Sequence, residues 1–403
     1  MELQKVKLGD VCRFINGRAY SQPELLDCGK YKVLRVGNIF DGNHWYYSDM
    51  ELEDDKYCND GDLLYSWACT FGPYIWHGPK TIYHYHIWKV EPNKGLVSKS
   101  FLYYFLNYQT KGFMGSTHGS TMIHITKENM ENFEVLLPSL LEQKKIASVL
   151  SALDDKIALN QQINRNLEEL ARLIYDYWFV QFDFPDKNGK PYKTSGGKMV
   201  YHDQLKREIP AGWEVGNLYA VAEYINGLAC QNNRPQKGEK ALPVIKIREM
   251  SDGITPDTEE VSENIPSKYI VENGDILFSW SATLMVMIWA GGKGGLNQHI
   301  FKVAPKDRFP KSFVYQLLSD YVVNFQQIAL SRKTTMGHIT SDHISLSRVV
   351  LPPENVLKQY AEKIDPIIEK NVRNQIEYRK LTALRDKLLP LLMNGQVSVE
   401  NLA

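Results

Sequence analysis

The sequence lacks the features by which several common protein classes are recognised. It contains no run of 18 or more uncharged apolar residues, so we expect no segment to span a bilayer. The N-terminal residues carry no apolar core of a secretion signal. The five cysteines are odd in number, widely spaced and free of any C-x-x-C motif. These absences predict a cytoplasmic protein with reduced thiols and argue against a disulfide framework or a zinc ribbon.

Motifs of enzymes that act on nucleic acids are also absent. An amino methyltransferase would need an [ND]-P-P-[YF] loop to hold the flipped base and a Gly-rich loop for its cofactor, whereas residues 351–354 read Leu-Pro-Pro-Glu. No G-x-x-x-x-G-K-[ST] phosphate-binding loop occurs, and no carboxylate cluster typical of a nuclease can be recognised. The sequence therefore predicts a protein that carries out no chemistry itself.

The charge balance is neutral, with 47 Lys and Arg against 47 Asp and Glu in 403 residues. Nucleic-acid binders are often basic overall, so this balance weighs slightly against a DNA partner. It does not exclude one, because a groove attracts phosphates through its local charge while acidic residues elsewhere cancel that charge in the sum. Net charge alone does not decide between the classes.

The strongest feature of the sequence is an internal repeat with a period of about 213 residues. Residues 8–17 (LGDVCRFING) return as residues 218–227 (LYAVAEYING), and residues 61–67 (GDLLYSW) return as residues 274–280 (GDILFSW). Further matches follow in the same order, and each copy ends in a Leu-Pro pair before a helical stretch. A period this long excludes a solenoid and indicates two copies of one domain.

Within each copy the local patterns alternate between strand and helix. Short β-branched and aromatic runs bounded by Gly, Asp, Asn or Pro predict strands at residues 31–36, 62–67 and 82–90. Apolar residues at helical spacing predict helices at residues 100–108 and 312–325. Each copy is therefore expected to be a mixed α/β domain.

A long helix with a coiled-coil seam is predicted after each domain. In both copies the seam residues recur in steps of three and four. In the first copy they are Ile146, Leu150, Leu153, Ile157, Asn160, Asn164, Leu167, Ala171, Ile174 and Trp178. In the second copy they are Tyr360, Ile364, Ile367, Asn371, Asn374, Tyr378, Leu381, Arg385, Leu388 and Leu392. Pro366 interrupts the second seam, so we expect a break there with Asp365 as N-cap.

Two seams of matching length in one chain can bury their apolar stripes against each other. Residues 183–210, rich in Gly, Lys and Pro, are long enough to reverse the chain, so we expect an antiparallel helix pair. Asn160 and Asn374 stand at equivalent positions, where a buried amide would fix the register; locally splayed helices would leave both solvated. A helix of about 27 residues spans about 40 Å, which is comparable to the ~34–36 Å of one DNA turn and suits a split DNA target.

These patterns predict an α+β protein with pseudo-two-fold symmetry, in which two long antiparallel coiled-coil helices separate two homologous mixed α/β domains. The expected boundaries are residues 1–138 for the first domain, 139–183 for a central helical spacer, 184–210 for a linker, 211–352 for the second domain and 353–403 for a C-terminal helical spacer.

The order of these motifs resembles the specificity subunits of type I restriction–modification enzymes. The resemblance rests on the two G-D-[LI]-[LI]-[YF]-S-W strands, the Leu-Pro pairs, the helical run at residues 141–170 and the IPAGWE segment at residues 209–214. It covers essentially the whole chain. Two features depart from the simplest pattern, namely Pro366 and the Leu-Lys-Gln at residues 357–359, where the first copy has Gln-Lys-Lys.

The resemblance implies two target-recognition domains, each reading one half of a bipartite site in double-stranded DNA. It also implies that the chain recruits two adenine-N6 methyltransferase subunits and, through them, restriction subunits. S-adenosylmethionine, ATP and Mg would then belong to those partners and not to this chain. The alternative from another class is a pseudo-symmetric protein-binding scaffold that never contacts DNA.

DNA-reading residues need donors and acceptors that reach base edges, with cations nearby for phosphates. In the first domain, loops after strands offer Arg18, Tyr20, Arg35, Asn38, Ser66, Thr70, His118, Ser120 and Thr121. In the second domain they offer Arg234, Lys246, Arg248, Ser279, Ser281, Thr283, Lys293, Asn297, Gln298, Arg332, Lys333 and Thr334. Positions that differ between the copies are expected to serve the half-sites, and an ordinary solvated loop is the alternative for any single residue.

Two aromatic and histidine groups have simpler structural explanations. Trp67 and Trp280 are more typical of a core than of base stacking. His77, His84 and His86 could together bind zinc, but the second copy does not repeat the set, so we expect no metal.

Overall fold

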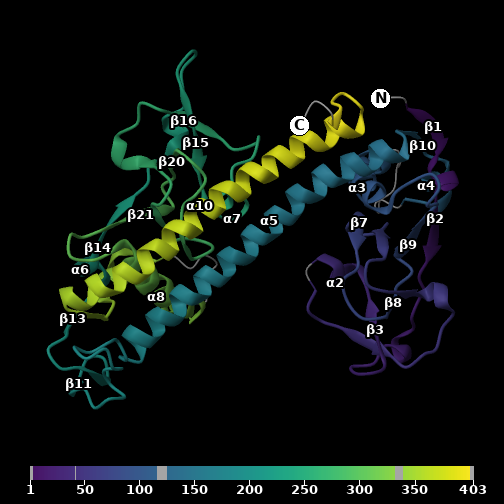
Figure 1. Ribbon diagram of the computed structural model, residues 1–403. Helices are drawn as coiled ribbons and strands as arrows, with labels where there is room; N and C mark the ends of the chain where they lie inside the picture. Colours follow the sequence, from purple (N-terminus) through teal and green to yellow (C-terminus); the bar gives the residue numbers. More distant parts are fainter. Residues whose placement is uncertain (1–2, 41, 116–124, 332–338, 400–403) are drawn as a thin grey trace. The chain divides into compact units, whose positions relative to one another are not determined.

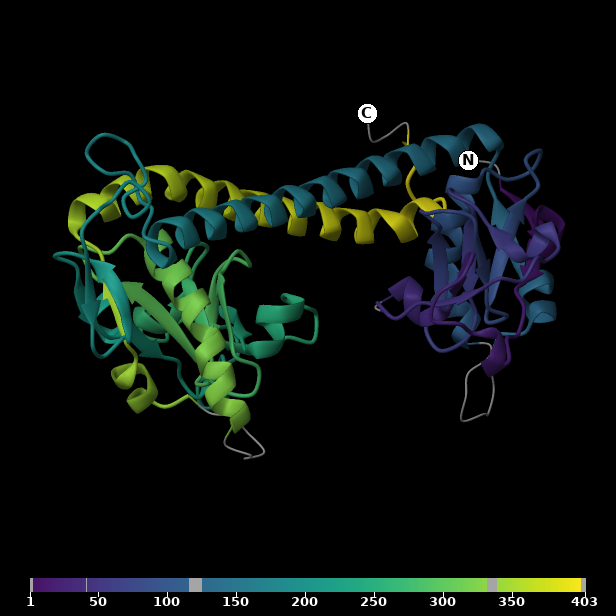
Figure 2. The same ribbon diagram turned by 90° about the horizontal axis from the view of Figure 1, so that it is seen from below.

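The computed structural model describes residues 3–40, 42–115, 125–331 and 339–399, and the chain divides into two compact units (Figures 1 and 2). Unit 1 comprises Met1–Lys156 and Leu381–Ala403, and unit 2 comprises Ile157–Lys380. Both boundaries fall inside the two longest helices, α5 (Leu140–Tyr175) and α10 (Glu354–Met393). Each unit therefore holds one domain and a part of each long helix.

The domain of unit 1 is built on two four-stranded sheets. One is antiparallel with the order β2-β9-β6-β7, and the other has the order β4-β3-β8-β5 with β3 and β8 parallel, while β1 pairs with β10. The strands are β1 (Gln4–Lys7), β2 (Cys12–Asn16), β3 (Tyr31–Leu34), β4 (Tyr46–Ser48), β5 (Tyr57–Cys58), β6 (Leu63–Ser66), β7 (Gly72–Ile75), β8 (Thr81–Tyr83), β9 (Ile87–Pro92) and β10 (Glu134–Leu137). The helices are α1 (Leu8–Val11), α2 (Val36–Phe40), α3 (Lys99–Gly115) and α4 (Lys127–Asn132).

The domain of unit 2 repeats this plan strand for strand. Its sheets have the orders β14-β21-β18-β19 and β16-β15-β20-β17, again with one parallel pair, β15 and β20, while β13 pairs with β22. The strands are β13 (Glu214–Gly216), β14 (Ala222–Asn226), β15 (Ala241–Ile245), β16 (Glu260–Ser262), β17 (Ile270–Val271), β18 (Ile276–Ser279), β19 (Met285–Ile288), β20 (Gly294–Leu296), β21 (Ile300–Pro305) and β22 (Val349–Leu351). The helices are α6 (Leu218–Val221), α7 (Ile247–Asp252), α8 (Lys311–Ser331) and α9 (Ser341–Leu346).

The central strand β6 explains why each domain has two layers of core. Its side chains alternate between the two faces of the sheet, as the pleat requires. Leu63 and Tyr65 join the core beneath α3, and Leu64 joins the core shared with the second sheet. In unit 2 the residues of β18 divide in the same way. All four residues of each strand are buried, so neither face of the strand meets solvent.

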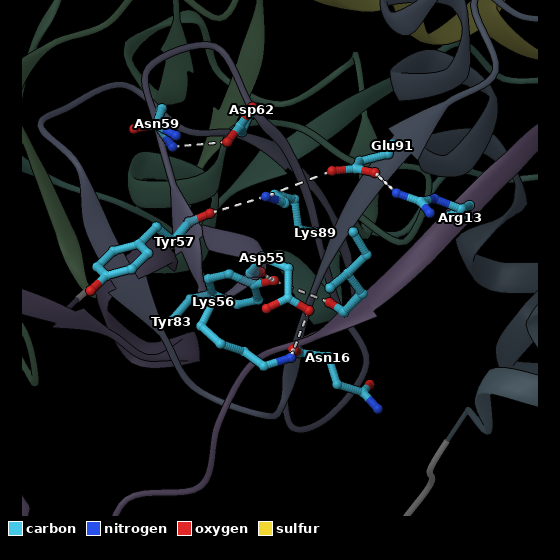
Figure 3. Close-up of polar contacts among 11 residues, drawn as sticks. Arg13, Asn16, Asp55, Lys56, Tyr57, Asn59, Asp62, Tyr83, Lys89 and Glu91 are labelled. Atoms are coloured by element: carbon cyan, nitrogen blue, oxygen red, sulfur yellow. Dashed lines mark hydrogen bonds and ion pairs between the residues drawn. The ribbon is translucent and has the colours of Figure 1, made fainter. Parts of the chain in front are cut away.

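A nearly buried lysine connects the two sheets in each domain. Lys89 on β9 donates to the backbone carbonyl of Tyr57 on β5 at 3.2 Å and lies 3.7 Å from a carboxylate oxygen of Glu91 (Figure 3). At the equivalent place in unit 2, Lys302 donates to the carbonyl of Ile270 and forms a 2.9 Å ion pair with Asp275. The repeat therefore preserves a polar connection as well as the apolar core.

The long helices pair in an antiparallel direction. Within unit 2, Asn371 of α10 donates to the carbonyl of Asn164 on α5, and Tyr360 packs against Trp178 just after the end of α5. Within unit 1, Arg385 forms a 2.9 Å ion pair with Asp154. All predicted seam residues are buried or half-buried, and Asn160 and Asn374 are only 1% and 3% exposed. The predicted fold class, including this helix pair, is confirmed.

The predicted helix break at Pro366 is wrong, because α10 continues through this residue. Pro366 lies on the exposed side of α10, while Ile364 is fully buried and Ile367 packs against the same core. Burial on both sides of the proline holds the helix together even though its ring removes one backbone hydrogen bond. Asp365 consequently lies inside the helix and caps nothing.

Residues 184–210, predicted to be a linker, contain a β-hairpin and an aromatic cluster. They contain a hairpin of β11 (Met199–His202) and β12 (Arg207–Pro210), and Phe184 stacks on Tyr192 with ring centroids 4.7 Å apart. The ring centroids of Trp213 and Phe184 lie 4.9 Å apart, and this contact packs the segment against the second domain. Among all helices in the described part of the chain, none combines the length and apolarity needed to cross a membrane.

Replacing Pro366 with alanine is expected to stabilise unit 2 by roughly 1–3 kcal/mol, because it restores the missing helical hydrogen bond and removes the ring from the helix interior. The measurement is the midpoint of urea unfolding of the full chain. Lys370→Ala, at an exposed position of the same helix, serves as the control and should change stability by less than about 0.5 kcal/mol. A lower midpoint for Pro366→Ala would contradict this account.

Candidate nucleic-acid interface

Loops that follow the strands of unit 1 meet at one edge of its sheets. The parallel strands β3 and β8 end side by side, and the next residues are joined by backbone hydrogen bonds. His84 N donates to Leu34 O at 2.9 Å, and Tyr85 N donates to Arg18 O at 3.0 Å. We call these loops the strand-end surface of unit 1, which comprises residues 17–20, 34–38, 66–70 and 84–86.

The same surface recurs in unit 2 with different side chains. Asn297 N donates to Ile245 O, and Leu228 N donates to Leu296 O. Ile339, the first described residue after 332–338, donates its N–H to the carbonyl of Trp280 at 2.9 Å. The strand-end surface of unit 2 comprises residues 227–230, 246–248, 279–283 and 297–299.

A glycine makes the close packing of these loops possible in both units. A Cβ atom on Gly17 would clash with the backbone carbonyl of His84, and one on Gly227 would clash with that of Asn297. Any other residue would push apart the two loops that flank the surface. This explains why the Ile-Asn-Gly sequence occurs at residues 15–17 and again at 225–227.

A tight turn after the central strand is also repeated. Cys69 and Ala282, at equivalent positions, adopt left-handed backbone conformations with φ of 65° and 55°. Residues other than glycine rarely adopt this conformation, and strained backbone of this kind is concentrated at functional sites. In both units the turn leaves the following threonine, Thr70 or Thr283, exposed.

Four of the predicted DNA contacts do not face the solvent. Ser66 and Ser279 are fully buried, and Ser281 and Asn297 are 5% and 6% exposed. The Ser279 hydroxyl donates to the carbonyl of Thr283, and Ser66 donates to that of Ala68. These serines shape the tight turn, because a short side chain at the end of a strand can reach the backbone of its own loop. The four buried side chains are therefore not in a position to contact DNA in this structure.

Four of the six predicted Lys and Arg residues that the structure describes are already paired with carboxylates of the same unit. Ion pairs join Arg18 to Glu24 at 2.6 Å, Lys246 to Glu259 at 2.5 Å, Arg248 to Glu249 at 2.8 Å and Lys293 to Glu263 at 3.4 Å. Arg35 and Arg234 form no such pair with any described residue. Because a paired cation attracts a phosphate less strongly, these two arginines are the stronger candidates for contacts with DNA.

Three other predicted residues have local roles. The Asn38 side chain donates to the carbonyls of Gly42 and His44 and accepts from Arg35 N, so it organises its loop. The Tyr20 hydroxyl is buried without a described partner, and burial raises the pKa of this side chain. Gln298 is half-buried beside His299. His118, Ser120, Thr121, Arg332, Lys333 and Thr334 lie outside the described residues.

Trp67 is half-buried and packs against the core of unit 1, with its ring stacked 5.7 Å from that of Trp88. Trp280 occupies the same place in unit 2. This agrees with the core role expected for both. The His84 and His86 rings lie 4.8 Å apart, whereas His77 contacts Asp60. Within residues 3–40, 42–115, 125–331 and 339–399, no group of three or more His, Cys, Asp or Glu is arranged to hold a metal.

Sequence reasoning missed the residues that control the charge of this surface. Glu24, Glu249 and Glu259 neutralise predicted DNA-binding cations, and Tyr46 stacks on Arg35 with its ring centroid 4.3 Å from the guanidinium carbon. Two of these contacts carried a local signal, because Glu24 lies six residues from Arg18 and Glu249 directly follows Arg248. The contacts of Glu259 with Lys246 and of Tyr46 with Arg35 depend on strand pairing that the sequence does not display.

The fold and the repeated strand-end surface define a class of protein in which two similar domains present the same loops with different chemistry. A family model described as "Type I restriction modification DNA specificity domain" matches residues 1–169 and 210–378, which together form most of the chain. The chain therefore belongs to the family of type I restriction–modification specificity subunits.

Individual relatives extend this match over the full length. The chain is 24% identical to the type I restriction enzyme HindI specificity subunit of Haemophilus influenzae, covering 98% of this chain and 99% of that protein. It is 27% identical to the MjaIX specificity subunit of Methanocaldococcus jannaschii over 77% of this chain and 72% of that protein. The crystal structure of an S subunit from M. genitalium has the same fold, with a TM-score of 0.63 at 14% identity over 97% of this chain and 96% of that one.

The strand-end surface of unit 1 should make the protein sensitive to acid. Burial, together with the charges of His86 and Arg35, lowers the pKa of His84 to about 4, from about 6.5 in an unfolded chain. Between these two values the unfolded chain binds more protons, so the folded state loses stability as the pH falls from 6.5 to 4 and keeps it above 6.5.

His84→Gln is therefore expected to melt with a weaker dependence on pH between 6.5 and 4 than the wild type, as followed by circular dichroism. His77→Gln is the matched control, because the side chain of His77 is 73% exposed. An acid dependence in His84→Gln as steep as in the wild type would refute the role assigned to His84.

Proposed function

We propose that the chain reads a bipartite sequence in double-stranded DNA, with one domain for each half-site, and carries out no catalysis itself. The observation that carries the proposal is the repeated strand-end surface, in which one backbone arrangement presents different side chains. Arg35, His84 and Cys69 in unit 1 correspond to Lys246, Asn297 and Ala282 in unit 2. A duplicated reader of two different half-sites needs this combination of constant backbone and variable chemistry.

The proposed contacts are the solvent-facing residues of the two surfaces. They include Arg35 and Thr70 in unit 1, and Thr283 and Gln298 in unit 2. The exposed Arg234, four residues beyond the surface of unit 2, and the sequence-predicted residues outside the described ranges complete the set. The paired cations Arg18, Lys246, Arg248 and Lys293 would serve phosphates only where DNA displaces their carboxylate partners.

Recruitment of methyltransferase subunits, and of restriction subunits through them, forms the second part of the proposal. The outer side of α5 supports it within unit 2, where Leu159, Leu170 and Leu173 are 50%, 44% and 58% exposed. Leucines repeated at helical spacing on an exposed face are typical of a surface that another protein covers. S-adenosylmethionine, ATP and Mg would act in those partner subunits.

The direct test is selection from a randomised duplex library by the chain in complex with its methyltransferase subunit. We expect a split motif whose binding weakens as salt concentration increases, because phosphate contacts release counterions. Without the chain, the methyltransferase subunit should select no motif. A protein-binding scaffold would add no sequence preference to the complex, and that outcome would refute the proposal.

Exchanging residues 211–352 for the corresponding domain of another specificity subunit should change one half-site of the selected motif and leave the other unchanged. The physical reason is that the contacts to each half-site come from one domain. Mapping modified adenines in cells that express the exchanged chain provides the readout. A change in both half-sites, or in neither, would contradict the division of the target between the domains.

Inserting seven residues after Lys156 and seven after Lys380 should lengthen the unread gap by about three base pairs. Each insertion adds two helical turns, about 10.5 Å, and keeps the seam in phase. Both half-sites should remain the same in library selection. Insertion into α5 alone serves as the control and should weaken binding, since it shifts one seam against the other.

A further inference from the structure

We propose that Arg35 reads a guanine in the half-site of the first domain, while the equivalent Lys246 contributes no base specificity to the second. This inference rests on the proposed function and adds to it one residue, one base and an asymmetry between the domains. It starts from a recess in the strand-end surface of unit 1 with a volume of about 420 Å³. The recess is lined by Arg35, Gly37, Asn38, His44, His84 and His86.

The guanidinium of Arg35 is held in place without being neutralised. It lies over the ring of Tyr46, and Tyr46 is fixed on β4 opposite Val33 of β3. The ring of His44 packs edge-on against Tyr46 at 4.7 Å. Arg35 forms no ion pair with any described carboxylate. Its Nε is buried and out of reach of a base. The two terminal NH2 groups bond to no described residue, so they are the donors that a base can meet. A planar donor group that is fixed by stacking and has unused N–H groups is suited to bidentate recognition.

Unit 2 replaces this arrangement with an ion pair at the same two positions. Continuing the register by one residue from the Pro243–Glu260 pair places Glu259 opposite Val244, as Tyr46 lies opposite Val33. Val244 N donates to Glu259 O at 2.8 Å, which supports this alignment. Glu259 therefore stands where unit 1 has Tyr46, and its carboxylate pairs with Lys246. The stacked arginine of one domain has become a neutralised lysine in the other.

The chemistry of the recess favours a base edge over a phosphate. A phosphate site gathers several cations, whereas this recess combines one guanidinium with imidazole and amide groups, and burial keeps His84 uncharged at neutral pH. The amide of Asn38 is fully used by its own loop. Arg35 is thus the strongest donor available, and guanine is the base whose O6 and N7 accept two hydrogen bonds from arginine in the major groove.

The test uses library selection with the chain in complex with its methyltransferase subunit, after the domain exchange has assigned each half-site. Arg35→Lys keeps the charge but lacks the planar pair of donors that stacking on Tyr46 holds in place, and Tyr46→Glu recreates the ion pair of unit 2. Both variants should lose discrimination at one guanine of the first half-site by roughly 5- to 150-fold. The other positions of that half-site should be retained.

Gly37→Leu provides a steric variant with little risk to folding, because a Cβ atom at Gly37 meets no atom within 4 Å. It should weaken recognition of the same base pair. Lys246→Met is the variant at the equivalent position of unit 2 and should leave the base preferences of the second half-site unchanged, even where loss of a phosphate contact lowers the affinity. Retention of the second half-site by every unit 1 variant shows that each chain is folded and assembled.

The possible results of library selection separate a base contact of Arg35 from a phosphate contact and from no contact. If Arg35→Lys and Tyr46→Glu select the wild-type motif, Arg35 does not read a base and the inference fails while the proposed function stands. If both weaken binding to all duplexes equally, Arg35 contacts a phosphate and the inference again fails. A wild-type complex that selects no motif would remove the proposed function and this inference with it.

Discussion

The structure depends on the burial of one helical seam against another. An apolar stripe repeated over 36 residues of α5 cannot remain in water, and the stripe of α10 covers it in the antiparallel direction. The same stripes also enter the domain cores. Ala171, Tyr175 and Tyr360 belong to the main core of unit 2, and Ile146 and Leu392 belong to that of unit 1. The long helices are therefore part of each domain's hydrophobic core, which agrees with family matches that extend beyond the Leu-Pro pairs to residues 169 and 378.

The seam is not purely apolar, and its polar positions differ between the units. In unit 2, Asn371 bonds to the carbonyl of Asn164 and to Glu168, whereas the side-chain nitrogens of Asn160 and Asn374 are buried without described partners. Unpaired buried amides cost free energy that leucines would not cost. In a coiled coil such residues disfavour other registers, which gives the antiparallel pairing its specificity. In unit 1 the polar contact between the two helices is the ion pair of Asp154 with Arg385. The Tyr104 hydroxyl also donates a hydrogen bond to Asp154.

Duplication explains how one scaffold can carry two strand-end surfaces with different side chains. Contacts that build the scaffold are repeated closely, as with Gly17 and Gly227 or Lys89 and Lys302. Contacts on the surface are not repeated, as with Arg35 over Tyr46 against Lys246 beside Glu259. A change on the surface leaves the buried network intact, so the side chains there can vary at little cost in stability.

The repeat, the mixed α/β class and the two seams could all be read from the sequence, because each rests on local periodicity or on matching segments. The loops that carry the predicted contacts could also be located from the sequence, since loops after strands are recognisable from their flanking residues. The burial of individual loop side chains was harder to predict from the sequence. Ser66 and Asn297 looked like solvent-facing donors, and only the packing of neighbouring loops shows that they are enclosed.

The tertiary structure decided two further points. Pro366 appeared to end a helix, but the burial of Ile364 and packing of Ile367 on either side outweigh the local cost of the proline. The free charge at each surface depends on strand register, which brings Glu259 to Lys246 and Tyr46 to Arg35 from 13 and 11 residues away in the chain. Sequence periodicity specifies which face of an element is apolar, but the partner of a surface charge exists only once the strands have paired.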